Sequence, residues 1–257
     1  MHASLLYSAP DLQLARVTCD GHDSPRPREE GVDSERLVLA LHGRFQYRDS
    51  RTRAVVSPGV GLRLGPQRPC EIRHPHGGGD ACLSVRGAWL RRWSHSDTST
   101  LAVSAEAYVR LQSLVSDVAR SEPLARVQVE EALGLILTPG ERGSTPVSPR
   151  ERDIAHAIAH EAALHFDAKV SVETLAASAG VSPFHACRVF RKVTGTGIHQ
   201  HLQEVRLRHA LALLLDTRLP LADVALEAGF ANQGHLGNAF RRRYGQTPGA
   251  ARRTRSV

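Results

Sequence analysis

The chain has 257 residues, of which 33 are lysine or arginine and 26 are aspartate or glutamate, giving a formal net charge of +7. The sequence predicts neither a membrane span nor a signal peptide, because it has no run of 18 apolar residues and residues 1–10 lack a basic start and a sustained apolar core. We therefore expect a cytoplasmic protein, and disulfides are rare in that compartment. The cysteines at positions 19, 70, 82 and 187 have neither CxxC nor zinc-ribbon spacing.

The first hundred residues have the pattern of short strands. Apolar runs at residues 54–56, 61–64 and 82–85 lie beside Pro-Gly pairs or a glycine run, and residues 36–47 alternate weakly between apolar and polar side chains. Strands at this spacing, separated by Pro/Gly corners, are typical of a small β-sandwich or barrel. We therefore predict strands up to about residue 100.

Residues 104–137 are predicted to form a pair of amphipathic helices. Apolar residues recur there at helical spacing, glycine is almost absent, and Pro123 divides the stretch. Such a pair packs either on its own domain or against a second copy of the chain. A polar, Pro/Gly/Ser-rich linker follows at residues 138–149, so the predicted domains are 1–137 and 150–257.

Two histidine pairs have spacings that metal sites use. His74 and His76 alternate along the chain, but Pro75 disfavours a regular central strand and no further Glu or His ligand follows. His156 and His160 lie four residues apart on a predicted helix, a spacing that can bind zinc. We interpret the first pair as turn histidines and the second as surface residues, and we predict no metal, no cofactor and no catalytic group.

A local pattern occurs twice in the C-terminal part. Residues 174–181 align with residues 223–230 at an offset of 49, and after Gly180 and Gly229 the offset becomes 50, which pairs Arg191 with Arg241. Each copy has a short helix, a glycine turn, a capping residue (Ser182 or Asn232) and a second helix, predicted at residues 183–194 and 233–244. This order is typical of a helix-turn-helix, and two copies predict two DNA-reading elements. The alternative is a helical hairpin repeated for packing alone, although solenoids need three or more units.

The segment between the two copies is predicted to be one helix, at residues 198–216. It contains no proline, and its apolar residues line two faces, so it must be buried on two sides. Its 19 residues span about 28 Å, close to the roughly 34 Å of one DNA turn. From Arg150 onward the chain has 15 basic and 9 acidic residues, so nearly all of the positive excess lies in this part, as a polyanionic partner requires.

Residues from about 153 to 252 resemble the DNA-binding domain of the AraC/XylS family of bacterial transcription regulators. The resemblance rests on DVALEAGF at 223–230, NQGHL at 232–236, AFRR at 239–242, YGQTP at 244–248 and VRL at 205–207. Three residues depart from the family pattern: Ala186 replaces the usual leucine, Gly234 has no side chain where a polar one is common, and Gly237 weakens a helix.

The resemblance implies that base-reading positions lie on the exposed face of each second helix. Arginine can bond a guanine edge, asparagine or glutamine an adenine edge, and an apolar side chain a thymine methyl. The base-contacting positions so implied are Phe184, His185, Cys187, Arg188, Gln233, Gly234, His235 and Asn238. The phosphate-contacting positions are Arg191, Lys192, Arg241 and Arg242.

The order of elements also resembles the family's N-terminal cupin-like sensor and dimerisation domain. The predicted fold class is therefore α+β: a cupin-like barrel or sandwich with a helical pair, followed by an all-helical domain. The predicted function is a sequence-specific transcription regulator that binds double-stranded DNA and a small-molecule effector, forms a homodimer and, if an activator, contacts RNA polymerase. The alternatives are a metal-dependent cupin enzyme with a DNA-binding appendage and an architectural DNA protein without base preference.

Overall fold

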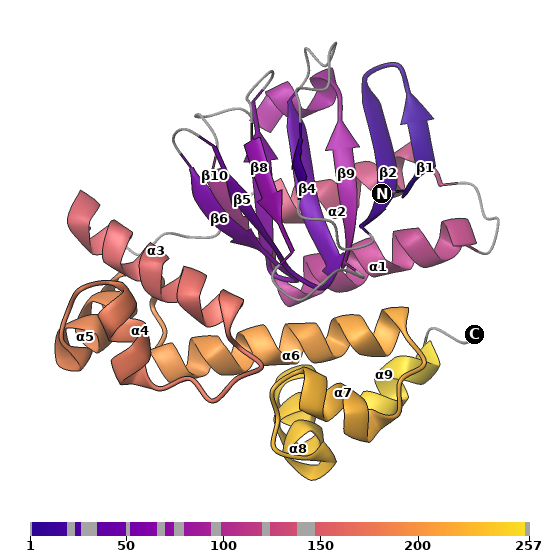
Figure 1. Ribbon diagram of the computed structural model, residues 1–257. Helices are drawn as coiled ribbons and strands as arrows, with labels where there is room; N and C mark the ends of the chain where they lie inside the picture. The colour runs from indigo at the N-terminus through magenta and orange to yellow at the C-terminus, as the bar shows by residue number, and fades with distance from the viewer. Residues whose placement is uncertain are drawn as a thin grey trace. The chain divides into compact units, whose positions relative to one another are not determined.

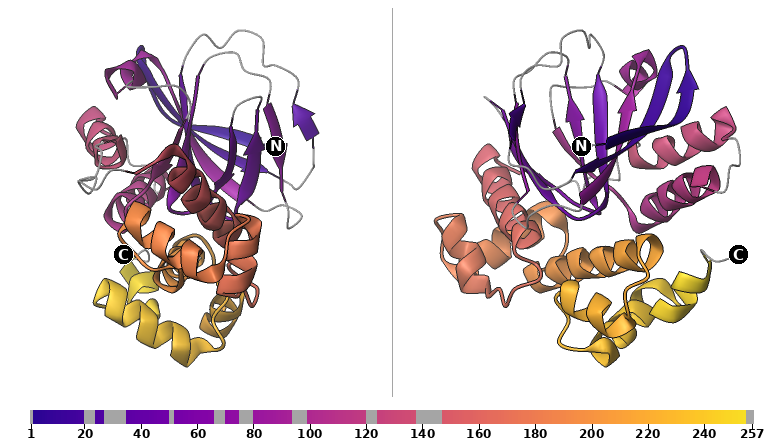
Figure 2. Two further views of the ribbon diagram at one scale, coloured as in Figure 1. Left: turned by 90° about the vertical axis from the view of Figure 1, so that its left-hand side faces the viewer. Right: turned by 45° about the vertical axis from the view of Figure 1, so that its right-hand side comes forward.

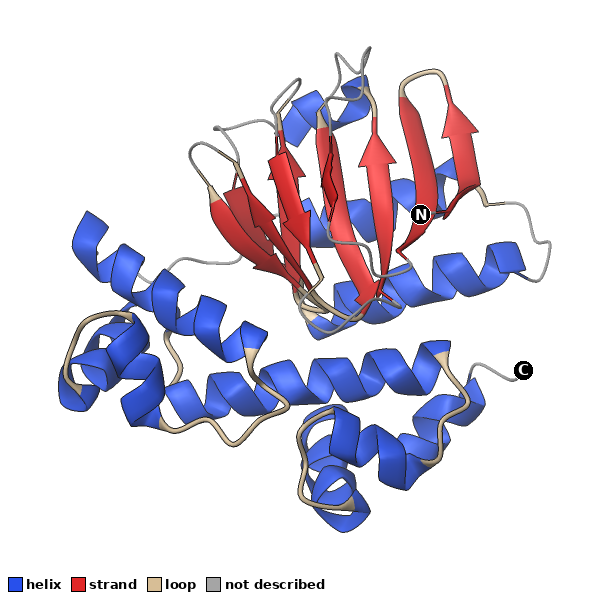
Figure 3. Cartoon of the chain, viewed as in Figure 1, coloured by secondary structure: helices blue, strands red, loops and turns tan. Residues whose placement is uncertain are grey.

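The computed structural model describes residues 2–19, 24–26, 35–49, 52–65, 70–74, 80–93, 99–119, 124–137 and 147–254. The chain divides into two units, Met1–Pro139 and Gly140–Val257. All described strands lie in the first unit, whereas the described part of the second unit contains helices without strands (Figures 1 and 3). The prediction of a β-rich part with a helical pair, followed by an all-helical part, is confirmed.

The described strands form two antiparallel sheets. One has the strand order β1-β2-β9-β4-β7-β10 and the other β3-β8-β5-β6. A short 3-10 helix, η1 at Ala88–Trp93, follows β9. The strand bounds are β1 His2–Ala9, β2 Leu12–Cys19, β3 Ser24–Arg26, β4 Arg36–His42, β5 Phe45–Arg48, β6 Arg53–Val56, β7 Val60–Leu64, β8 Cys70–Arg73, β9 Asp80–Arg86 and β10 Ser99–Ala102. The runs at 54–56, 61–64 and 82–85 all lie in strands, as predicted.

The two sheets share an apolar core. Strand side chains alternate between the two faces of a sheet, so every second residue of β5 and β6 points to the same side. The core contains Val38, Ala40 and Leu62 from the first sheet and Phe45, Tyr47, Ala54 and Val56 from the second. All seven are buried and pack against one another between the two sheets. The ribbons of the two sheets can be followed in Figure 2.

The predicted helical pair consists of α1 at Ala105–Ala119 and α2 at Arg126–Leu137, which contact each other. A β-bulge links α1 to the sheet. The ladder between β4 and β9 shifts register between Ala40 and His42, so Leu41 is the extra residue. Its carbonyl accepts hydrogen bonds from the Tyr108 hydroxyl and from Gln112 Nε2, the latter at 3.0 Å. The helix thereby satisfies a backbone group that the bulge removes from the ladder.

The second unit begins with a helix that starts before the predicted domain boundary. Ser148 and Pro149, placed in the linker by the sequence, are the N-cap and first residue of α3. Residues 138–146 lie outside the described residues. The helices are α3 Pro149–Leu164, α4 Val172–Ser178, α5 Pro183–Thr194, α6 Ile198–Asp216, α7 Leu221–Glu227, α8 Gln233–Tyr244 and α9 Pro248–Thr254.

Helix α6 belongs to two helical groups (Figure 1). Its first half buries Ile198, Leu202 and Val205 in one core with α3, α4 and α5. Its second half contacts α7 and α9 and buries Leu211 and Leu214. The prediction of a helix buried on two sides is therefore confirmed, and α6 spans about 28 Å at 1.5 Å per residue.

Candidate nucleic-acid interface

The second helix of each repeat, α5 or α8, follows a tight glycine turn. Gly180 and Gly229 have φ of 65° and 77°, in the left-handed region that glycine enters without a Cβ clash. Ser182 and Asn232 then cap α5 and α8, accepting hydrogen bonds from the backbone N–H three residues on at 3.3 Å and 2.8 Å. These turns, caps and helix bounds confirm the sequence predictions.

Burial of one face of each helix determines which side chains face solvent. Val189 and Phe190 of α5 are 1% and 0% exposed, and Leu236, Ala239 and Phe240 of α8 are 0%, 4% and 0% exposed. Because helical side chains repeat every 3.6 residues, the opposite face of each helix is turned outward. The predicted base-contacting positions lie on those outward faces.

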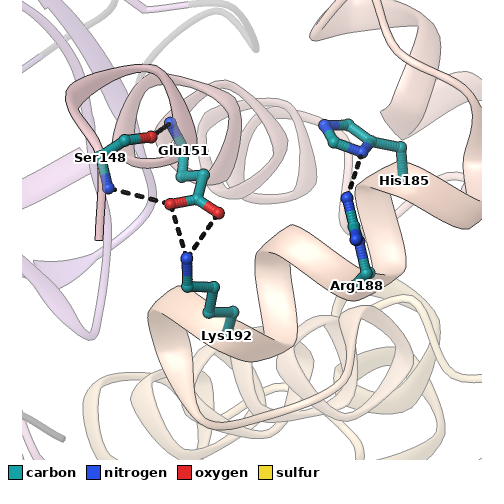
Figure 4. A network of polar contacts seen from close by, with 5 residues as sticks. All are labelled: Ser148, Glu151, His185, Arg188 and Lys192. Atoms are coloured by element: carbon teal, nitrogen blue, oxygen red, sulfur yellow. Dashed lines mark hydrogen bonds and ion pairs between the residues drawn. The ribbon is translucent and has the colours of Figure 1, made fainter. Parts of the chain in front are cut away.

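On α5 the most exposed large apolar side chain is Phe184, which is 82% exposed. Cys187 and Arg188 are also exposed, whereas His185 is half-buried. Arg188 NH2 lies 3.2 Å from His185 Nδ1, so the histidine ring and the guanidinium lie close together (Figure 4). The helix thus presents a ring, a thiol and a cation side by side.

On α8 the exposed positions are Gln233, Gly234, His235 and Asn238. The His235 ring packs edge-on against the buried Phe230 ring, with centroids 5.3 Å apart and an interplanar angle of 86°. Phe230 thereby holds the His235 ring close to the capped end of the helix. Gly234 contributes only backbone, so the two second helices offer different side chains to a groove.

The last turns of both helices are basic. Arg191 and Lys192 end α5, and Arg241, Arg242 and Arg243 end α8. Arg191 and Arg241, which the repeat aligns, are both exposed and make no ion pair among the described residues. Arg242 NH2 donates to the neutral Gln203 side chain at 3.3 Å. The cations of this surface therefore differ in whether another side chain of the protein already binds them.

The Lys192 ammonium forms an ion pair with an acidic residue of α3. Its Nζ lies 2.7 Å and 2.9 Å from the two carboxylate oxygens of Glu151 (Figure 4). Glu151 also closes a capping box, because it accepts from the Ser148 backbone N–H at 2.9 Å while its own N–H donates to the Ser148 hydroxyl at 3.2 Å. The Lys192 ammonium and the Ser148 backbone N–H lower the pKa of Glu151 to about 2.

The second repeat contains a similar ion pair between distant residues. Arg243 Nε donates to the two carboxylate oxygens of Glu204 at 3.0 Å and 2.8 Å, which joins α8 to α6. The Glu204 carboxylate raises the pKa of Arg243. Neither ion pair is predictable from the sequence, since the partners are 41 and 39 positions apart and each acid resembles an ordinary solvated helix residue.

Arg206 links α6 to the segment between α3 and α4. Its Nε donates to the Phe166 carbonyl at 2.7 Å and its NH2 donates to the Ala168 carbonyl at 3.0 Å. Gly229 sits against the same place: a Cβ added there would lie 2.5 Å from the Phe166 carbonyl oxygen. The turn before α8 is therefore packed against the first helical group, whereas the turn at Gly180 has nothing within 4 Å of such a Cβ.

The predicted turn histidines fall at the edge of the described residues. His74 is buried, and its Nδ1 lies 2.5 Å from Asp80 Oδ2, while His76 lies outside the described residues. His156 is exposed and His160 is half-buried. Across the described ranges, no group of three or more His, Cys, Asp or Glu side chains is arranged to hold a metal ion. None of the helices described is both long and apolar enough to span a membrane.

Comparison with known proteins gives matches to the helical unit. Residues 175–254 match the family model described as "Helix-turn-helix domain". The HTH-type transcriptional regulator GlxA of Rhizobium meliloti (strain 1021) is 46% identical over 79 residues, which are 31% of this chain and 24% of GlxA. The regulatory protein SoxS of Salmonella typhimurium (strain LT2) is 30% identical over 84 residues, which are 33% of this chain and 78% of SoxS.

Among solved structures, the DNA-binding domain of AdpA, a global transcriptional factor crystallised with a target DNA, is 33% identical. The alignment covers 40% of this chain and 92% of that chain, with a TM-score of 0.38. The chain spans about a quarter to a third of the length of the first curated relatives it matches. With SoxS matched over most of its length, the chain belongs to the AraC/XylS family of transcription regulators.

Proposed function

We propose that this protein is a sequence-specific transcription regulator that binds double-stranded DNA through two helix-turn-helix modules. The modules are α4 with α5 and α7 with α8, and α5 and α8 are the helices that enter the major groove. The repeated geometry carries the proposal: two exposed helices, each preceded by a positive-φ glycine and a side-chain cap, are joined by one helix of 19 residues. That helix is close to one DNA turn in length.

Base reading is proposed for the outward faces. Arg188 would bond a guanine edge, Gln233 or Asn238 an adenine edge, and Phe184 a thymine methyl. The exposure of Phe184 supports this role, because a ring of that size gains nothing from facing water. His185, Cys187 and His235 would contact bases beside them, and Gly234 would allow close approach of the backbone.

Phosphate contacts are proposed chiefly for Arg191 and Arg241. Both are exposed, both end their helices, and neither is engaged by an acid among the described residues. Arg242 would contribute as well, since its present partner is the neutral Gln203. Lys192 ranks below them because a phosphate would have to displace Glu151. These contacts would fix the register of the helices on DNA without reading sequence.

The first unit is proposed to be a cupin-like effector and dimerisation domain without enzymatic activity. Val109 of α1 and Val127 and Leu135 of α2 are 43%, 70% and 41% exposed, which supports a homodimer through the helical pair. An effector bound to this unit would change how α5 and α8 are presented to DNA. An activator would also contact RNA polymerase.

Selection from a randomised DNA library at fixed salt tests the proposal. The full chain should enrich a motif with two conserved blocks about one turn apart. Arg188→Ala should lose preference at one position of one block, whereas the Arg191→Ala and Arg241→Ala variants should keep the motif and bind it more weakly. Binding without enrichment would overturn sequence-specific regulation in favour of an architectural role.

A further inference from the structure

The smaller sheet has an arginine cluster on the face that does not contribute to the core. Strands β8, β5 and β6 are neighbours in this sheet (Figure 1). Tyr47 and Ala54 point into the core between the sheets, so the adjacent Arg48 and Arg53 point to the opposite face. The register places Arg48 directly across from Arg53 on one side and from Glu71 on the other. It also places Gln46 across from Arg73.

The charges of this face are not balanced. Glu71 forms an ion pair with Arg73, whose Nε and NH2 lie 2.7 Å and 2.6 Å from Glu71 Oε1. The nearby Asp49 is held in the hairpin turn, where it accepts from the Tyr47 hydroxyl at 2.9 Å and from the Thr52 backbone N–H at 2.5 Å. Arg48 and Arg53 make no ion pair among the described residues. Like charges directly opposite each other on paired strands are destabilising, so this arrangement costs stability unless an anion lies between them.

The same residues line a hollow. Gln46, Tyr47, Arg48, Arg53, Glu71 and Arg73 surround a cavity of about 80 Å³. This exceeds the roughly 10–15 Å³ that a single water needs, so the hollow has room for one compact oxyanion. Each guanidinium has five N–H donors in a planar fork that matches carboxylate and phosphate oxygens. The residues stand on strands, so the hydrogen-bonded sheet holds their backbones in place.

We infer that this hollow, formed by Arg48, Arg53 and Arg73 with the Gln46 amide, is a binding site for a compact oxyanion, either a phosphate group or a small dicarboxylate. Arg48 and Arg53 bind the anion from adjacent strands, Gln46 donates through its amide, and Arg73 remains paired with Glu71 at the rim. The site lies on the outer face of the sheet because the space between the sheets is packed by apolar side chains. It exists whether or not α5 and α8 read DNA.

Calorimetric titration of the full chain with inorganic phosphate, and separately with malonate, tests the inference at constant ionic strength. Whichever anion binds more tightly identifies the source of the oxyanion. The double variant Arg48→Gln, Arg53→Gln should lose about tenfold or more in affinity. The matched control Arg91→Gln, Arg92→Gln removes the same charge from exposed side chains of the 3-10 helix η1 of the same unit and should bind the anion as the wild type does.

A charge reversal separates binding from folding. Arg53→Glu replaces the like-charged pair with a cross-strand Arg-Glu pair, so Tm should rise in buffer without phosphate or dicarboxylate. Adding the anion should then raise Tm in the wild type and leave the variant unchanged. The inference is overturned if neither anion binds saturably, if Arg48→Gln, Arg53→Gln binds like the wild type, or if the Arg91→Gln, Arg92→Gln control loses the same affinity.

Discussion

Glu151 and Lys192 are joined across 41 positions of the chain, with the lysine Nζ 2.7 Å and 2.9 Å from the two carboxylate oxygens. The pair connects the first turn of α3 to the last turn of α5. Glu151 also holds the Ser148 backbone N–H, so one carboxylate both caps α3 and fixes the end of a candidate DNA-reading helix. Anything that draws Lys192 toward a phosphate would also release one part of this cap.

The pH dependence of stability should report this pair. The folded pKa of Glu151 is about 2 against an ordinary value of 4.5, so its contribution is present above pH 4.5 and is lost as the pH falls toward 2. Glu151→Gln should therefore unfold at lower urea concentration than the wild type at pH 7, with the difference shrinking below pH 4.5. The double variant with Lys192→Gln should show less than the sum of the two single effects, and strict additivity would rule the coupling out.

The salt dependence of DNA binding should distinguish cations that already pair with an acidic side chain from cations that do not. Arg191→Ala should weaken binding to all sequences and reduce the slope of log K against log salt by about 1, whereas Lys192→Ala should change the slope less. Glu151→Gln should steepen it, because it releases Lys192 for phosphate. Arg110→Ala in α1, where Arg110 pairs with Glu131, serves as the charge-matched control. Equal slope changes for Arg191→Ala and Lys192→Ala would contradict the assignment.

The two repeat glycines should respond unequally to alanine. Both have positive φ, which costs a residue with a Cβ about 1–2 kcal/mol. At Gly180 that is the whole effect, since nothing lies within 4 Å of the added Cβ. At Gly229 the Cβ would also lie 2.5 Å from the Phe166 carbonyl oxygen and 2.9 Å from Asp167 Cα. Urea unfolding of the full chain should show the larger loss for Gly229→Ala, and equal losses would refute the packing argument.

Gly237 lies within α8 and should be replaceable with a gain in stability. An added Cβ meets nothing within 4 Å, and alanine lowers the conformational entropy of the unfolded chain. Gly237→Ala should raise the free energy of unfolding by about 0.5–1 kcal/mol. Gly234→Ala is the comparison, because its Cβ would lie 3.3 Å from the capping oxygen of Asn232 and should give a smaller gain or none.

Phe184 should matter for binding and not for folding. Its ring is 82% exposed, so Phe184→Ala should leave the urea midpoint nearly unchanged while weakening binding to the selected DNA motif. Phe190→Ala is the opposite case, since that ring is fully buried and its loss should cost about 3–5 kcal/mol. A large fall in stability for Phe184→Ala would show that the ring packs rather than reads bases.

Local chemistry made the helical unit predictable from the sequence. The bounds of α5, α6 and α8, the glycine turns and the caps at Ser182 and Asn232 each depend on residues within about four positions of one another. The start of α3 was missed because Ser148 and Pro149 fit both a Pro/Ser-rich linker and a capped helix start. Strand β1 was not predicted, because His2–Ala9 lacks a clear alternation of buried and exposed residues, and β2 was not predicted although Leu12, Gln13 and Leu14 do alternate.

By itself, the sequence determined the repeat, the helices that carry it, their outward faces and the family to which they belong. Only the tertiary structure decided which cations remain available on those faces. Lys192 pairs with Glu151 and Arg243 pairs with Glu204 because helix packing brings their backbones together. Arg48 lies across from Arg53 because of the sheet register. Helical periodicity and capping are encoded over a few residues, whereas the partner of a long charged side chain depends on elements that are distant in sequence and adjacent only after folding.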